Sequence, residues 1–199
     1  MEKQASCVSK IVTPAADGAP FAMLGSAMAA SSPAILAPFA GTSAQTGVHG
    51  LHINPADENI RLGPLAVRFL ITGETSGGCI AAFEVHVPKA QRLAAAAHSH
   101  DRYEETIYGI DGMLTWTVNG RPFDVGPGQA LCIPRGAVHR FDNNGNSDAK
   151  SLCVITPAAI GPEYFRESAE VLKAAAGGPP DLAKMNEIMR RHGITPARP

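Results

Sequence analysis

The chain has 199 residues, of which 45% are hydrophobic, and a formal net charge of -1. This length and composition fit one folded domain, with or without tails. The sequence contains no basic run and no stretch with the length and hydrophobicity of a membrane span. It therefore favours neither nucleic-acid binding nor insertion into a membrane.

Residues 1–46 are rich in Ala, Ser, Pro, Thr and Gly and have no sustained helical or strand period. Two interpretations stay open: a loose arm, or an arm that lies across the folded domain or a partner subunit. The apolar run at 21–30 starts far from the N-terminus and lacks a basic start, unlike a usual signal peptide. We expect a cytoplasmic protein, with export by a weak N-terminal signal as the alternative.

The four cysteines are far apart, and no pair has the close spacing of a zinc or redox motif. We therefore expect reduced, mostly buried thiols. These cysteines are Cys7, Cys79, Cys132 and Cys153.

After the arm, the sequence becomes typical of short strands, with runs of β-branched and aromatic residues. In one run, Phe83 and Val85 alternate with Glu84 and His86, which predicts one apolar face. The candidate strands outside the central stretch are Gly50–Asn54, Leu65–Thr72, Cys79–Pro88 and Lys150–Thr156.

The central stretch, 98–143, has a turn signal about every eight residues. Gly, Asn and Asp tolerate the positive φ of tight hairpins, and Pro presets the other turn corner. The spacing predicts an all-β fold, an antiparallel barrel or sandwich, rather than a parallel sheet with helices between the strands. The signals are Asp111-Gly112, Asn119-Gly120, Gly126-Pro127-Gly128, Pro134-Arg135-Gly136 and Asn143-Asn144-Gly145.

After Pro157 the apolar period changes to that of helices. A first helix is expected at 162–175, and a second helix is expected to be capped by Asp181 and ended by Gly193. Their apolar stripes need cover from the β-domain or from a second subunit. We place the boundaries of the chain at an arm 1–46, a β-domain 47–157 and a helical extension 158–199.

Four side chains of the central stretch suit one metal ion: His98, His100, Glu105 and His139. His98 and His100 are two residues apart, so an extended chain points both to one face. Three imidazoles and one carboxylate suit a divalent transition ion such as Fe, Mn, Ni, Co, Cu or Zn. Four protein ligands leave a position open on a five- or six-coordinate ion, as catalytic sites require.

The spacing of these residues resembles the cupin superfamily. Its first motif is Gly, five residues, His-x-His, three or four residues, Glu, six residues, Gly. The chain has His98-Ser99-His100, four residues, Glu105, six residues, Gly112. The second motif is Gly, five residues, Pro-x-Gly, two residues, His, three residues, Asn. The chain matches it completely with Gly128, Pro134-Arg135-Gly136, His139 and Asn143.

Two positions bear on the first motif. Arg92 stands where its glycine should be, which puts the shape of the site's entrance in question. Glu104 is a rival carboxylate at the family's shorter spacing, but only Glu105 also has the spacing to Gly112. Glu105 is therefore the expected ligand.

The resemblance covers about residues 60–157 and is greatest to single-domain (type 2) cupins of the quercetin 2,3-dioxygenase type. It implies an antiparallel cupin β-barrel, a double-stranded β-helix of jelly-roll type, with one metal ion inside. Small barrels bind ligands among their inward side chains. Phe141 and Leu114 are the pocket candidates, although core packing is an equal interpretation for Phe141. Cupins commonly pair, so we expect a homodimer.

The function expected from this resemblance is a metal-dependent dioxygenase that acts on a small organic substrate. The substrate would bind as a monoanion, such as an enolate, a phenolate or a flavonol. Glu105 would be catalytic, because it is the ligand able to leave the ion and take a proton, a role known in quercetinase-like cupins. The alternatives are a non-oxidative isomerase, epimerase or lyase, and a non-catalytic protein that binds small molecules.

Overall fold

The structure is a computed structural model that describes residues 59–91 and 97–197. The predicted arm at 1–46, the strand candidate Gly50–Asn54 and Arg92 lie outside these residues. The described strands are β1 (Asn59–Leu62), β2 (Leu65–Ile71), β3 (Ala81–Val87), β4 (His98–His100), β5 (Glu104–Asp111), β6 (Leu114–Val118), β7 (Arg121–Val125), β8 (Ala130–Ile133), β9 (His139–Asp142), β10 (Ala149–Thr156) and β11 (Ile194–Pro196). The helices are α1 (Pro162–Ala174) and α2 (Leu182–Arg191), and neither is long and apolar enough to span a bilayer.

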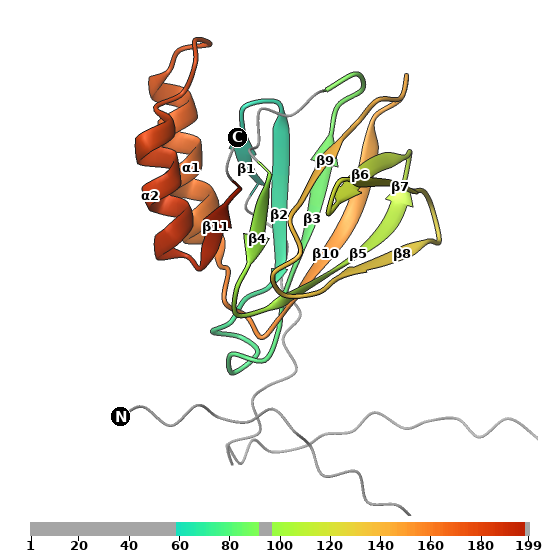
Figure 1. Cartoon of the computed structure of the whole chain (residues 1–199), viewed down its shortest axis with the longest axis horizontal. Coiled ribbons are helices and arrows are strands. Elements are labelled where there is room, and N and C mark those ends of the chain that lie inside the picture. Colours follow the sequence, from blue (N-terminus) through green and yellow to red (C-terminus); the bar gives the residue numbers. More distant parts are fainter. Residues whose placement is uncertain (1–58, 92–96, 198–199) are drawn as a thin grey trace, which may run out of the picture. The chain divides into compact units, whose positions relative to one another are not determined.

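The strands form two antiparallel sheets, shown in Figure 1. One has the order β1-β2-β3-β10-β5-β8 and the other β11-β4-β9-β6-β7. Inward side chains of both sheets share one core, with Phe83 and Ile107 from the first and Trp116 and Val125 from the second. The predicted all-β fold of antiparallel strands is therefore confirmed. The predicted homodimer stays a prediction.

The strand predictions hold where side chains alternate clearly. In β3, Phe83, Val85 and Val87 are buried, while Glu84 and His86 are only partly buried on the other face. In β10, buried and partly buried residues alternate along the whole strand. The predictions missed β1 and β11, because strands of four and three residues are too short to show a period.

Both predicted helices are present, with the expected ends. Pro162 occupies the first turn of α1, and the Asp181 carboxylate accepts a hydrogen bond from the Lys184 N–H at 3.0 Å. Gly193, which follows α2, has a φ of +73°, a conformation that ends helices. The helices lie side by side at one end of the β-domain, next to β1 and β11 (Figure 1). The Phe165 ring of α1 packs against Phe83 at 5.2 Å between centroids, so the β-domain covers the apolar face of α1.

The thiol prediction is wrong for Cys79, which is disulfide-bonded. Of the other described cysteines, Cys153 is a buried free thiol, whereas Cys132 is free but exposed. Disulfide formation depends on approach in space, which the distance between cysteines along the chain does not reveal.

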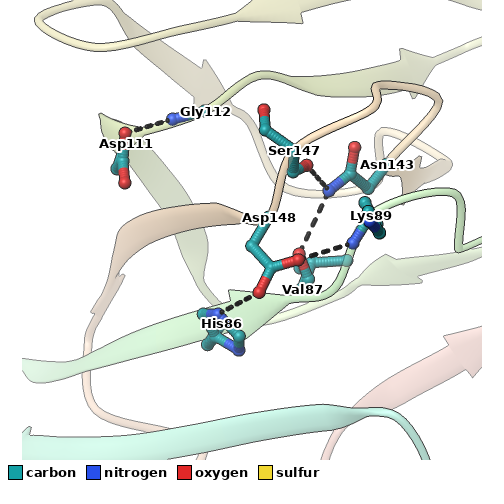
Figure 2. Close-up of polar contacts among 8 residues, drawn as sticks. All are labelled: His86, Val87, Lys89, Asp111, Gly112, Asn143, Ser147 and Asp148. Atoms are coloured by element: carbon teal, nitrogen blue, oxygen red, sulfur yellow. Dashed lines mark hydrogen bonds and ion pairs between the residues drawn. The ribbon is translucent and has the colours of Figure 1, made fainter.

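Asn143 ties the turn before β10 to the end of β3, as Figure 2 shows. Its Nδ2 donates to the carbonyl oxygens of Val87 at 3.1 Å and Ser147 at 2.9 Å. Its Oδ1 accepts a hydrogen bond from the Gly145 N–H at 3.0 Å, and the side chain is 1% exposed. Asn143 directly follows β9, so these bonds fix the end of the strand that carries His139.

We expect Asn143→Ala to lower the free energy of unfolding by about 3 kcal/mol, because two carbonyl oxygens lose their donor in a buried setting. Asp148→Ala is the matched control from the same turn (Figure 2). Asp148 accepts from the Lys89 N–H at 3.0 Å, but its side chain is 56% exposed. Its loss should cost less than about 1 kcal/mol. Urea denaturation measures both, and equal losses would contradict the assigned role of Asn143.

Candidate metal centre

Three histidines meet in the five-stranded sheet. His98 and His100 lie on β4, and His98 pairs directly with His139 of the neighbouring strand β9. One ring nitrogen of each histidine can bind a metal ion, and these three nitrogens lie within 4.8 Å of one another. The sequence therefore brings two ligands from a His-x-His strand against a third from the adjacent strand.

The turn before β9 explains this approach. Gly136 has a φ of +76°, and its N–H donates to the His100 carbonyl oxygen at 2.9 Å. The Pro-Arg-Gly turn is thus bonded to the end of β4. Next along the chain, the Ala137 carbonyl oxygen lies 2.9 Å from His139 Nδ1. That carbonyl accepts from Nδ1–H, which leaves Nε2 as the nitrogen available to an ion.

Glu105 reaches the same place from the other sheet. It lies on β5, is 6% exposed, and its Oε2 is 3.3 Å from His139 Nε2 and 3.8 Å from His100 Nδ1. Glu104, the rival carboxylate, has a side chain that is 44% exposed and pairs with Arg135 at 3.2 Å. Neighbouring residues of a strand face opposite ways, so only Glu105 faces the histidines.

Burial and mutual charge shift the titration of this group. Burial lowers the pKa of His100 from 6.5 to about 3. Burial alone would also lower the pKa of His139, but the adjacent Glu105 carboxylate raises it above 6.5. Burial alone would raise the pKa of Glu105, but His139 and then His100 lower it below 4.5. Glu105 is therefore an anion at neutral pH and His100 a neutral imidazole, the forms that bind metal ions.

The donor set fits a transition ion. His100 Nδ1 and His139 Nε2 are buried and make no hydrogen bond to the described residues. Such nitrogens are costly unless a ligand satisfies them. Two nitrogens bonded to one ion at about 2.1 Å lie at most about 4.2 Å apart, so small rotations of the rings would close the group. The three histidines can hold the ion, with Glu105 beside them.

The histidines and Glu105 line a cavity of about 120 Å³. Most of its other lining is apolar or aromatic, including Phe83, Trp116, Phe141, Tyr164 and Phe165. The ring of Phe141 lies 4.6 Å from that of Trp116. The cavity is therefore an apolar space with its polar groups gathered at the metal centre.

Leu114, the other pocket candidate, lies in the core at 1% exposure and outside the cavity lining. It shares the inward face of β6 with Trp116, but it pairs with Val125. The residue of β6 that pairs with His139 is Val118, four positions further on. Leu114 faces inward but lies too far along the strand to reach the site.

Cys153 and Tyr164 are among the lining residues that the sequence did not place at the site. Cys153 lies on β10, paired with Ile107, so it is a diagonal neighbour of Glu105 on the inward face. Burial, and then the charge of Glu105, raise the pKa of the Cys153 thiol well above its usual range, so it stays protonated. The alternation of β10 predicts that Cys153 faces inward. No sequence pattern indicates that α1 brings Tyr164 to the cavity.

Comparison with known proteins agrees with this geometry. Residues 83–155 match the family described as Cupin domain. The tetracenomycin polyketide synthase protein TcmJ of Streptomyces glaucescens is 31% identical over 117 residues, which are 59% of this chain and 78% of TcmJ. The chain belongs to the cupin family. The match supports the use of both cupin motifs to locate the site.

Two other proteins resemble this cupin. Quercetin 2,3-dioxygenase of Bacillus subtilis is 29% identical over 79 residues, which are 40% of this chain and only 22% of the dioxygenase. Among solved structures, KdgF from Halomonas sp. has a TM-score of 0.46 and 16% identity, over 53% of this cupin and 90% of KdgF.

We expect the purified cupin to carry close to one transition ion per chain, measured by elemental analysis. His100→Ala and His139→Ala should each remove most of it, because each deletes a buried donor that the ion needs. His86→Ala is the matched control, since His86 lies on β3 with a side chain that is 42% exposed. Full metal content in the double variant would rule out this ligand set.

We expect the metal-free protein to be most stable near pH 6.5. Below that pH the unfolded state protonates His100, whereas the folded state does so only near 3, so stability falls with pH. Glu105 adds to this loss below 4.5, because its folded pKa is lowered. The contribution of His139 is present below 6.5 and is lost as pH rises through its raised folded pKa.

Urea denaturation of the metal-free protein between about pH 4 and pH 9 would measure this curve. In a His100→Gln variant, the free energy of unfolding should fall less steeply below pH 6.5, because the imidazole that resists protonation is gone. Stability that increases as the pH falls below 6.5 would contradict the assigned environment of His100.

Proposed function

We propose that this cupin is a metal-dependent oxygenase that acts on a small enolisable or phenolic compound. The observation that carries the proposal is the meeting of three histidines and a buried carboxylate at the polar end of an apolar cavity. The likeness to quercetin 2,3-dioxygenase supports it, although it spans a small part of that enzyme. When bound, a divalent ion supplies Lewis acidity towards substrate oxygens and, if it is Fe, Mn, Ni or Cu, a redox centre.

Glu105 is the residue assigned to proton transfer. It is anionic at neutral pH and lies beside the histidines, within reach of a substrate held there. It would take the proton that an enol or phenol loses on binding, and it would act only while the carboxylate is ionised. The Cys153 thiol is a diagonal neighbour of Glu105 on the adjacent strand, and its raised pKa keeps it protonated, so it does not compete for the proton.

The apolar lining has a separate role. Trp116, Phe141 and Phe165 surround the space next to the metal centre and leave few polar partners for water. Excluding water protects a reactive intermediate and strengthens the electrostatic interactions of Glu105. The same lining disfavours sugars, because their many hydroxyl groups would lose their hydrogen bonds to water without replacement.

A second candidate function is a non-oxidative reaction at the same centre. The 31% identity to TcmJ favours it, since that protein is described as part of a polyketide synthase. Polyketide chains carry carbonyl groups on alternate carbons, and such groups enolise readily. An isomerase or lyase acting on them would use the same Glu105 base and the same ion, but no dioxygen.

Oxygen uptake separates the two functions. The metal-free cupin would be reconstituted separately with Fe, Mn, Ni and Co and offered acetylacetone, catechol and a flavonol. We expect oxygen uptake that depends on substrate, and a loss of about a hundredfold or more in Glu105→Gln, which keeps the shape but not the base. Asp148→Ala should retain full activity. Equal turnover without oxygen would replace the oxygenase by the isomerase or lyase.

A further inference from the structure

Helix α1 supplies one wall of the cavity. Tyr164 and Phe165, in its first turn, both line the space next to the histidines. The Phe165 ring packs against Phe69 at 5.5 Å and Phe83 at 5.2 Å between centroids. Tyr164 packs edge-on against Phe165 at 5.0 Å. This wall is therefore an aromatic cluster anchored in the core of the six-stranded sheet.

The wall leaves little space. The cavity measures about 120 Å³. Pockets for drug-sized ligands span about 300–1,000 Å³, and an apolar cavity of about 150 Å³ accepts benzene. The part of a substrate that reaches the histidines is thus about the size of one six-membered ring.

The wall also lacks charge. None of the described side chains that line the cavity is a lysine or arginine. Burial raises the pKa of Tyr164 to about 12, so this side chain is neutral at physiological pH. The ionic groups of the lining are gathered at the histidines and Glu105. A second charged group on the substrate would be buried without a partner, which is costly.

We infer that α1, through Tyr164 and Phe165, restricts this cupin to ligands with one ring or a short chain and no charge beyond the metal-bound oxygens. The inference rests on the proposed function, because it assumes that substrate oxygens bind at the metal centre. It narrows the substrate class to simple catechols, phenols and β-diketones. Flavonols and carboxylated or phosphorylated compounds are excluded.

Calorimetric titration of the cobalt-loaded cupin under nitrogen tests this without turnover. The three probes are catechol, protocatechuate, which adds a carboxylate to the same ring, and a flavonol, which adds rings around similar chelating oxygens. We expect catechol to bind, and each of the other two to bind about a hundredfold more weakly or not at all. Metal-free protein should bind none of them.

Two variants test the wall. Tyr164→Ala should gain flavonol binding by about tenfold or more while catechol binding changes little. Tyr164 and Phe165 are both only partly buried, so neither change removes a fully buried core side chain. Phe165→Leu, which keeps apolar volume in the core, is the second variant. Val171→Ala is the control, because Val171 is buried in the same helix at 3% exposure but lies outside the lining.

The outcomes are distinct. If neither catechol nor acetylacetone, titrated in the same way, binds the cobalt-loaded protein, the proposed function fails and this inference fails with it. If protocatechuate or flavonol binds the wild type as tightly as catechol, the inference alone is overturned. It is also overturned if neither wall variant gains flavonol binding, or if Val171→Ala gains as much.

Discussion

Holding three imidazoles, two of them buried, against a buried carboxylate is the constraint on which the rest of this structure depends. Each group would be better solvated in water, and two ring nitrogens, on His100 and His139, make no hydrogen bond to the described residues. Glu105 compensates part of this cost through its charge beside His139. The two sheets must hold all four groups in place, since a small separation would leave each one buried alone.

The backbone around the site serves that constraint. The Gly136 N–H fixes the turn before β9 to the carbonyl of His100, and Asn143 fixes the other end of the same strand. Both residues belong to the second cupin motif, which therefore contains one ligand and the supports on either side of it. The motif therefore specifies the turns that hold His139 in place as well as the metal ligand itself.

The sequence was sufficient to locate the residues of the metal centre but not to predict which other side chains line the cavity. Turn spacing and alternation predicted most strands, and the distance to Gly112 favoured Glu105 over Glu104, whose side chain pairs with Arg135 instead. What failed depends on contacts between distant segments. Leu114 has the right face but the wrong position along β6, and Tyr164 reaches the cavity because of how α1 docks. No local sequence pattern indicates either the position of Leu114 relative to the site or the docking of α1.

The short strand β11 joins the C-terminal segment to the metal centre. Ile194 pairs with His100 and Pro196 with His98, so the last strand of the five-stranded sheet borders the strand that presents two histidines. Fraying of this tail would loosen β4, and a ligand that holds β4 in place would oppose fraying. Because β11 and β4 share backbone hydrogen bonds, we expect their amides to exchange with solvent together, in one local opening. The exchange rate of the β11 amides would then report how tightly a ligand is bound at the metal centre.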